Sequence, residues 1–215
     1  FFSSYRGDVK RLPELKCMNT FQPEDRVLII GGAGFIGRRL TERCLKDTLH
    51  VTCLRLSSSD SRKQHLQNLE ILQADISNKE QLMHVLQERL FDYVFNLGGY
   101  IDHTPYLKGG RRLIESHFIG LMNLVDCLDK ERLKGFVQIG SSDEYGNAPA
   151  PQKETMREMP ISPYSLSKAA ASQFIQMLSH TEGFPGVVLR FFLVYGPGQD
   201  DKRFVPQIIK ACLQD

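Results

Sequence analysis

The sequence predicts an α/β fold in which a doubly wound parallel sheet carries helices on both faces. Short, continuous apolar runs alternate with segments of helical spacing, and glycines follow the first apolar run. Continuous apolar strands are typical of parallel sheets that are covered on both faces. Right-handed crossovers between such strands give the doubly wound arrangement.

Each expected strand is a run of mostly apolar residues. The six are Val27–Ile30, Val51–Leu54, Leu69–Leu72, Tyr93–Leu97, Gly135–Ile139 and Gly186–Phe191. Between them, apolar residues at helical spacing predict the helices. Their ranges are Phe35–Leu45, Leu82–Leu86, Leu113–Leu128 and Pro163–His180. Residues 1–25 are expected to form an N-terminal extension.

Composition narrows the class of protein. The 215 residues are 41% hydrophobic and 24% charged, with a net charge of +2, which excludes disordered and collagen-like chains. The small net charge gives no basis for binding nucleic acid or a membrane. The five cysteines are scattered and form no C-x-x-C pair, which favours buried thiols in a reducing compartment over disulfides or a metal site. We therefore expect a soluble cytoplasmic protein without a metal.

The glycines after the first strand predict a phosphate-binding loop. They fit G-x-x-G-x-x-G starting at Gly31 or G-x-G-x-x-G starting at Gly32. Glycines let the backbone approach a pyrophosphate, and the N–H groups of the following helix bind it. Position after a first strand and before a helix is what a dinucleotide motif requires. The residues expected to contact the cofactor are Gly31, Gly34, Phe35, Ile36 and Gly37.

Cofactor choice is expected to depend on the end of the second strand. An acidic residue there binds the ribose of NAD, whereas this strand ends in Arg55, which suits the 2′-phosphate of NADP. The cofactor is therefore NAD or NADP, with NADP slightly favoured, and a solvated arginine is the alternative. Asp75, after the third strand, is placed to contact the adenine and to cap the next helix.

The start of the last long helix carries the main chemical signal. Ser162 is suited to cap this helix and Pro163 to occupy its first position. Tyr164 and Lys168 are four residues apart and share one helix face. A lysine beside a phenol lowers its pKa and makes it usable as an acid or base. Such pairs also arise by chance, but Ser141, at the end of the fifth strand, adds a hydroxyl that can bind a substrate oxygen.

In this order, the landmarks resemble the extended short-chain dehydrogenase/reductase family of NAD(P)-dependent nucleotide-sugar epimerases, dehydratases and reductases. The resemblance covers the chain from about Arg26 onward and includes Arg190 with the run Val194–Gly198. It implies a Rossmann fold with an NAD(P)-binding domain over residues 26–196. Residues 197–215 would begin a substrate-binding region that is mostly absent. Such a chain should bind the dinucleotide better than it turns over a sugar.

The resemblance also implies residue roles. Tyr164 would remove a proton from a sugar hydroxyl, commonly at C4, while hydride passes to the nicotinamide. Lys168 would hold the nicotinamide ribose, Ser141 would polarise the sugar oxygen, and Ile76 and Leu97 would line the cofactor.

An ungapped comparison places Asp143 where many dehydratases have an acid/base Glu. A one-residue gap would match Ser142-Asp143-Glu144 to their Thr-Asp-Glu instead. The alternative is a solvated pair of loop acids.

Several positions depart from the family pattern and leave the reaction open. Asn96–Gly99 replaces the usual His-Leu-Ala-Ala, and Leu193 replaces a common Asn. We expect an epimerase or dehydratase acting on a nucleotide-diphosphate sugar, which Arg203 could contact. The alternatives are an NADPH-dependent 4-keto-sugar reductase, favoured by Arg55, and a non-catalytic dinucleotide sensor. The family implies a homodimer through a four-helix bundle, although each apolar helix stripe can also pack only on its own sheet.

Overall fold

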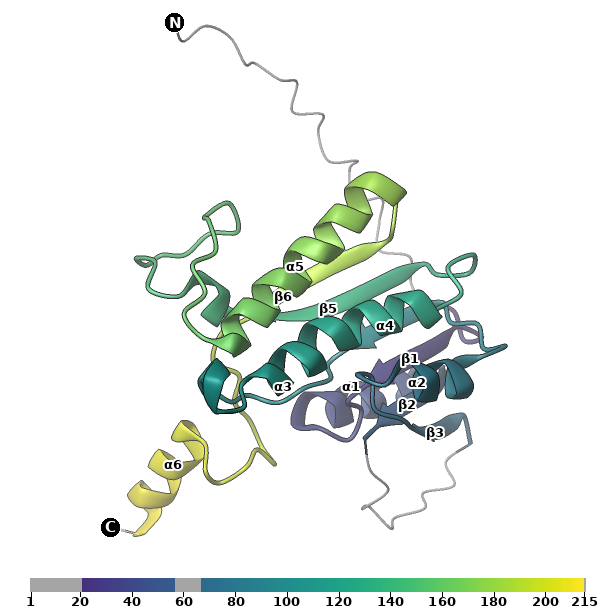
Figure 1. Ribbon diagram of the computed structural model, residues 1–215. Coiled ribbons are helices and arrows are strands. Elements are labelled where there is room, and N and C mark those ends of the chain that lie inside the picture. Colours follow the sequence, from purple (N-terminus) through teal and green to yellow (C-terminus); the bar gives the residue numbers. More distant parts are fainter. Residues whose placement is uncertain (1–20, 57–66, 215) are drawn as a thin grey trace, which may run out of the picture.

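A six-stranded, wholly parallel sheet forms the centre of the computed structural model, which describes residues 21–56 and 67–214 (Figure 1). The strand order is β3-β2-β1-β4-β5-β6. The strands are β1 (Arg26–Ile30), β2 (His50–Arg55), β3 (Leu69–Gln73), β4 (Tyr93–Asn96), β5 (Gly135–Ser141) and β6 (Gly186–Phe191). All six predicted strands are present, and the doubly wound α/β fold is confirmed.

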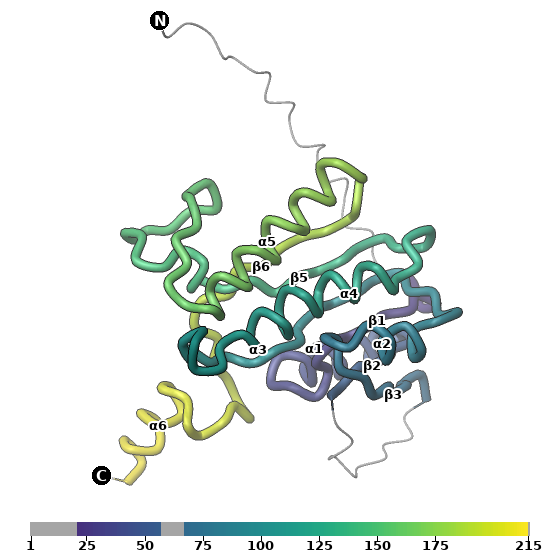
Figure 2. The backbone as a smooth tube through the Cα atoms, in the orientation of Figure 1, coloured from purple at the N-terminus to yellow at the C-terminus, as the bar shows by residue number. Residues whose placement is uncertain are grey.

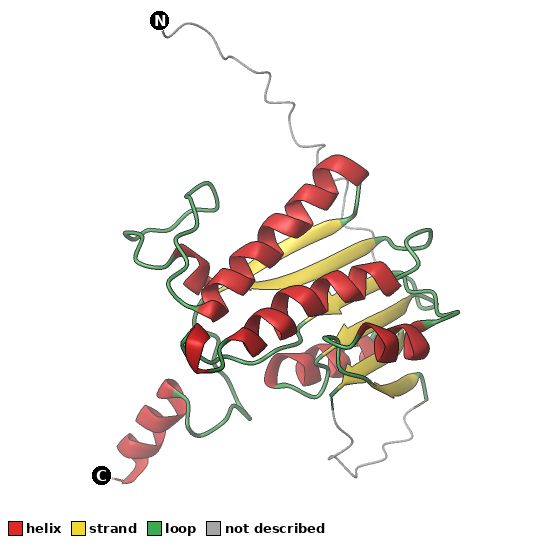
Figure 3. Ribbon diagram, viewed as in Figure 1, coloured by secondary structure: helices red, strands yellow, loops and turns green. Residues whose placement is uncertain are grey.

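The helices up to residue 182 follow the four predicted ranges with one interruption, and the helix over residues 204–214 was not predicted (Figure 3). They are α1 (Phe35–Lys46), α2 (Lys79–Leu86), α3 (Arg111–Ile114), α4 (Gly120–Cys127), α5 (Pro163–Glu182) and α6 (Phe204–Gln214). A π-helical turn, Glu115–Ile119, joins α3 to α4 within what the sequence predicts as one helix. At the start of α5, Ser162 is the N-cap and accepts a hydrogen bond from the Ser165 N–H, and Pro163 is the first helical residue, as predicted.

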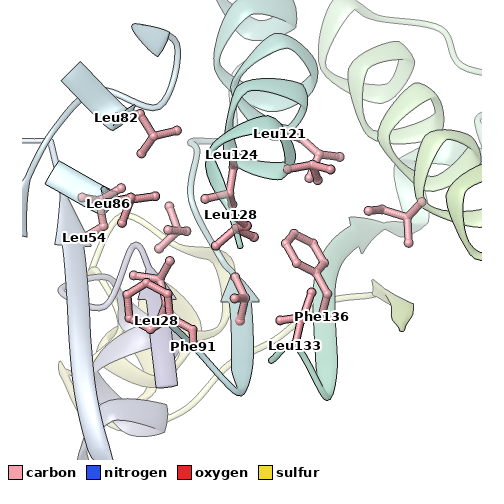
Figure 4. Packing of buried hydrophobic residues seen from close by; sticks show 14 of the residues in the cluster. Leu28, Leu54, Leu82, Leu86, Phe91, Leu121, Leu124, Leu128, Leu133 and Phe136 are labelled. Atoms are coloured by element: carbon pink, nitrogen blue, oxygen red, sulfur yellow. The ribbon is translucent and has the colours of Figure 1, made fainter. Parts of the chain in front are cut away.

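Two apolar layers hold the sheet between its helices. Alternate residues of β1 point to opposite faces, so Leu28 packs with α2, α4 and α5 while Val27 packs with α1. Figure 4 shows the first layer, where Leu82, Leu124 and Phe136 converge from two helices and a strand. Figure 2 follows the backbone through this arrangement. β1 and β4 pair with each other at the centre of the sheet.

The expectation that the strands are covered on both faces is wrong for the two edges. In β6, Val187 and Leu189 keep 54% and 41% of their surface exposed. Most residues of β3 are also exposed or half-buried. The reason is that α1, the helix seen on the second face in the described part of the chain, packs against β1 and β2.

The amino-terminal edge of the sheet is fixed by buried carboxylates. Asp92 accepts hydrogen bonds from the Arg26 N–H and the Arg132 side chain, and Lys134 bonds Asp25 at 2.6 Å. Burial alone would raise the pKa of Asp92, but these donors outweigh it and lower the pKa. Residues 21–25 of the expected extension therefore pack on the domain, while residues 1–20 lie outside the described part.

The described cysteines and helices can be compared with the expectations of unpaired thiols and of no membrane binding. Cys44, Cys53, Cys127 and Cys212 are free thiols, and Cys17 lies outside the described residues. Among the helices of residues 21–56 and 67–214, none is long and apolar enough to cross a membrane.

Candidate active site

The carboxyl ends of β1 and β4 form the point where the strand order reverses. In doubly wound sheets this is where ligands bind. Gly31 follows β1 and Leu97 follows β4, and a Cβ placed on Gly31 would lie 3.0 Å from the Leu97 carbonyl oxygen. Two residues predicted to contact the cofactor thus come together at the edge where a dinucleotide is expected.

Backbone geometry shows why glycines occupy the loop after β1. The Gly34 N–H donates to the Gly31 carbonyl at 2.9 Å, and a Cβ on Gly37 would lie only 2.1 Å from the same oxygen. Gly34 and Gly37, which belong to both registers, therefore lie against the Gly31 carbonyl group. Gly31 itself, at φ +76°, has a backbone conformation that favours glycine. Any side chain at Gly37 would push α1 away from the loop.

The first turn of α1 has the chemistry that a pyrophosphate needs. Gly34 is its N-cap, and within the described residues no side chain caps the helix and no acid lies in its first turn. The N–H groups of Phe35 and Ile36 and the helix dipole can therefore serve a phosphate. The close-packed glycines and this free helix start fit the dinucleotide that the motif predicts.

Arg55 stands at the expected adenosine end of the site. Its side chain is half-buried, and its Nε atom is buried without a hydrogen-bond partner among the described residues. A buried donor left unpaired costs free energy unless a ligand or water satisfies it. This unpaired donor suits a phosphate group.

The predicted helix cap at Asp75 is wrong. Asp75 accepts hydrogen bonds from the N–H and hydroxyl of Ser77, whereas Asn78 caps α2 by accepting from the Gln81 N–H. The Asp75 carboxylate therefore shapes the turn after β3. This leaves its predicted contact with the adenine as a proposal.

Ile76 is held beside the glycine-rich turn after β4. A Cβ on Gly98 would touch its side chain, and Asn123 of α4 donates to its carbonyl at 3.0 Å. The sequence analysis missed Asn123, although an amide within the apolar stripe of a helix is a detectable signal.

Tyr164 and Lys168 are both buried at the start of α5, on the same edge. Tyr164 is 5% exposed and Lys168 is 4% exposed. The Lys168 ammonium lies 5.8 Å from the centre of the Tyr164 ring and donates to the Ile139 carbonyl at 3.0 Å. The Ser141 hydroxyl lies near enough to the Tyr164 phenol to lower the pKa of that phenol. Three predicted site residues are thus in one cluster.

The pKa of Tyr164 moves in the opposite direction from the expectation. Burial, the largest effect, raises it, and the bond from Ser141 only partly opposes this. Burial also lowers the pKa of Lys168 to about 8, against the carboxylate of Glu144. The Lys168 ammonium donates to the Ile139 carbonyl and not to the phenol. The expected lowering is therefore wrong for the protein without ligands.

The two acids of the loop after β5, Asp143 and Glu144, differ in their exposure to solvent. The Asp143 side chain is 40% exposed, with an oxygen 4.0 Å from the His103 Nε2, whereas Glu144 is fully buried. The solvated-pair alternative is therefore wrong for Glu144, because Arg190 draws its carboxylate inward. The geometry also speaks against the gapped comparison, since Glu144 is bound to structural groups, and it leaves Asp143 as the acid that faces solvent.

Two histidines that the sequence analysis missed flank Tyr164. The rings of His103 and His117 meet the Tyr164 ring nearly edge-on, with centres 5.9 Å and 5.2 Å away. His117 lies on the π-helical turn and its Nε2 is 2.9 Å from the Tyr100 carbonyl. Gly99, at φ +110°, leaves room for it, since a Cβ there would lie 2.0 Å from the imidazole. His117 thus joins the turn after β4 to the start of α5.

His117 predicts a pH dependence of stability. Burial, helped by the Lys168 charge, lowers the pKa of His117 to about 4. The unfolded imidazole, with a pKa of about 6.5, takes up a proton that the folded one excludes. Stability is therefore full above that value and falls as the pH drops toward 4. We expect wild type to lose about 1–2 kcal/mol more than His117→Gln between pH 7 and pH 5, measured by urea unfolding.

A matched control for this prediction is His180→Gln, because His180 is exposed near the end of α5. It should lose stability as wild type does. Equal losses for wild type and His117→Gln would show that His117 does not exclude the proton.

A cavity of about 320 Å³ lies elsewhere, at the amino-terminal edge of the sheet. Arg26, His50, Glu70 and Arg89 are among its lining residues. It contains none of the predicted site residues. No group of three or more potential metal-ligating side chains occurs within residues 21–56 and 67–214.

Comparison with known proteins shows the family of this chain. The sequence pattern of the NAD-dependent epimerase/dehydratase family matches residues 27–215. The chain belongs to this family. A dTDP-glucose 4,6-dehydratase of Salmonella typhimurium is 26% identical over 218 residues, covering 88% of this chain and 60% of that protein. The resemblance to extended short-chain dehydrogenases/reductases is thereby confirmed.

Solved structures of family members share the fold. One is a UDP-N-acetylglucosamine 4-epimerase of Methanobrevibacter ruminantium in complex with UDP-N-acetylmuramic acid, with a TM-score of 0.77 and 27% identity over 89% of this chain and 63% of that one. Another is a dTDP-glucose 4,6-dehydratase of Bacillus anthracis in complex with NAD, with a TM-score of 0.73 and 25% identity over 88% and 61%. The chain thus spans about three-fifths of these relatives.

Proposed function

We propose that this protein is a nucleotide-sugar epimerase or dehydratase that oxidises its sugar at one carbon, commonly C4, with Tyr164 as the acid/base. The observation that carries the proposal is the cluster of Tyr164, Lys168 and Ser141, at the same edge of the sheet as the glycine loop. A proton acceptor, a cation and a hydroxyl thus lie at the edge where a doubly wound sheet binds its ligand.

The roles follow from the hydrogen bonds of each group. Tyr164 accepts the sugar hydroxyl proton, and Lys168 holds the nicotinamide ribose, the role that the family resemblance implies. The Ser141 oxygen accepts the Asp143 N–H at 3.2 Å, which leaves its own proton free to donate to the sugar oxygen. When bound, the dinucleotide supplies the hydride acceptor, and Gly31, Gly34, Phe35, Ile36, Gly37, Arg55, Asp75, Ile76, Leu97, Tyr164 and Lys168 are proposed to hold it.

A further acid/base role is proposed for Asp143. It is the exposed acid of the loop, and the His103 Nε2 lies 4.0 Å from one of its oxygens. Because many dehydratases have an acid/base residue at the position of Asp143, this pair favours a dehydratase over an epimerase. Arg203, an exposed residue just before α6, is proposed to contact a substrate diphosphate.

A homodimer through α4 and α5 is also proposed. After these helices pack on the sheet, Ile119, Leu166 and Met177 remain 39%, 49% and 44% exposed. A second copy of the chain could cover these apolar side chains in a four-helix bundle. Sedimentation in solution tests the proposal, because a monomer at working concentrations would contradict it.

Bound cofactor and products test the reaction directly. Mass spectrometry should find a dinucleotide with the purified protein, and incubation with a panel of nucleotide-diphosphate sugars should give an epimer or a 4-keto-6-deoxy product. Bound NADP without an internal redox cycle would contradict both and favour a 4-keto-sugar reductase. The unpaired Nε of Arg55 is the observation that keeps this second function open.

Arg55 predicts a preference that binding can measure. Arg55→Ala should weaken NADP binding about 10–100-fold, the loss of a charge-assisted hydrogen bond, and leave NAD binding nearly unchanged. Isothermal titration with both dinucleotides measures the ratio. Arg89→Ala, at the opposite edge of the sheet, is the control and should change neither. An equal loss for NAD and NADP would remove Arg55 from the 2′-phosphate site.

A further inference from the structure

Glu144 is a fully buried carboxylate next to the proposed site. It lies in the 3₁₀ turn Ser142–Tyr145 that follows β5. One of its oxygens accepts the Ser141 N–H at 2.8 Å, and the other accepts the Ser172 hydroxyl and the Arg190 Nε, each at 2.8 Å. All three partners are donors, so both side-chain oxygens of Glu144 act only as acceptors here.

Rigid elements anchor the partners of Glu144. Arg190 on β6 has a side chain only 8% exposed, and it also contacts Glu158 and donates to the Tyr145 hydroxyl at 3.1 Å. Ser172 lies one helical turn after Lys168 on α5. Glu144 therefore connects β6 and α5 to the backbone at the end of β5.

Ser141 is held from two sides by this arrangement. Its N–H is bound by Glu144, and its side-chain oxygen accepts the Asp143 N–H at 3.2 Å. The two bonds form a reciprocal cap of the turn. With its backbone and one lone pair fixed, the Ser141 hydroxyl is held near enough to the Tyr164 phenol to lower the phenol pKa.

We propose that Glu144 is a positioning residue that holds the Ser141 hydroxyl against Tyr164. The inference deepens the proposed function, because Ser141 and Tyr164 are the groups assigned to the sugar. Stability alone does not require this arrangement, since buried ion pairs are often matched or exceeded by apolar packing. Its value lies in fixing a hydroxyl at the end of a strand to the geometry that proton transfer needs.

A double-mutant cycle at Tyr164 tests the proposal without a sugar. The pKa of Tyr164 is followed by phenolate absorbance, as the difference between each protein and its Tyr164→Phe version. In wild type, Ser141→Ala should raise this pKa by removing a hydrogen bond to the phenolate. Glu144→Gln leaves one acceptor oxygen for three donors, so it should hold Ser141 less firmly. In this variant, Ser141→Ala should therefore raise the pKa of Tyr164 by less than about half as much as in wild type.

The cycle removes effects that do not pass through Ser141. Asp143, Lys168, Arg203, His103 and His117 also surround Tyr164, but they are unchanged. The loss of the Glu144 charge affects both arms equally. Glu158→Gln is the control, because it also removes a carboxylate partner of Arg190 but does not touch Ser141. It should keep the full rise.

A full rise in Glu144→Gln would overturn the proposal. If that variant does not fold, Ser172→Ala can replace it, because it removes one anchor of Glu144 without removing a charge. In this background, Ser141→Ala should raise the pKa of Tyr164 by less than in wild type. An unchanged rise in folded Ser172→Ala would then overturn it. The proposed function is tested by a separate result. Turnover that survives Tyr164→Phe would contradict the proposed function but would not affect the coupling between Glu144 and Ser141.

Discussion

Replacing Tyr164 by Phe is expected to lower the rate of sugar oxidation by about 10²–10⁴-fold, the usual contribution of a positioned acid/base. Dinucleotide binding should remain largely intact, because the change removes one oxygen and keeps the buried ring between its two histidines. The formation of reduced nicotinamide should be followed with the protein in excess over the nucleotide sugar. This isolates the chemical step from product release.

Tyr93→Phe is the matched control for this experiment. Tyr93 is the first residue of β4 and packs on Phe21 at the opposite edge of the sheet, so its loss should not change the rate. Full activity of Tyr164→Phe would show that the assigned mechanism is wrong. Tight dinucleotide binding by wild type without oxidation of any tested sugar would favour the non-catalytic sensor.

Gly37→Ala is expected to have the largest effect on the cofactor. The added Cβ would lie 2.1 Å from the Gly31 carbonyl oxygen, so the loop or α1 must move. Overpacking of this kind costs about 1–3 kcal/mol, and the same movement displaces the N–H groups proposed to hold the pyrophosphate. We expect the dissociation constant for NAD to rise more than about tenfold, measured by isothermal titration.

Gly196→Ala separates this effect from a general loss of glycine. A Cβ there would lie 3.6 Å from its nearest atom, on Phe35, which is an ordinary contact. Its affinity for NAD should stay close to that of wild type. Unchanged affinity in a folded Gly37→Ala protein would contradict the assignment of the phosphate-binding loop.

Local signals made much of the fold predictable. The continuous apolar run of β1 and the glycines that follow it place a strand, a turn and a helix without knowledge of any distant contact. The cap at Ser162 and the proline after it likewise determine where α5 starts. That start in turn places Tyr164 and Lys168 one turn apart.

The electrostatics of the site depended on contacts between distant residues. Glu144 is buried because Arg190, 46 residues later in the sequence, lies on the neighbouring strand. His117 is neutral because three elements close around it, and Lys168 bonds a carbonyl 29 residues earlier. Neither residue spacing nor local propensity contains this information. The alternative of a solvated acid pair was therefore wrong for Glu144, and so was the expected lowering of the phenol pKa.

Hydrogen-exchange mass spectrometry with and without saturating NAD tests the central claim most directly, because it locates the dinucleotide on the chain itself. We predict slower exchange at the backbone amides of residues 31–38 and 97–100. The peptides around Arg26, His50 and Arg89, which line the cavity at the opposite edge, should be unchanged. Protection at that cavity, with none over residues 31–38, would contradict the account.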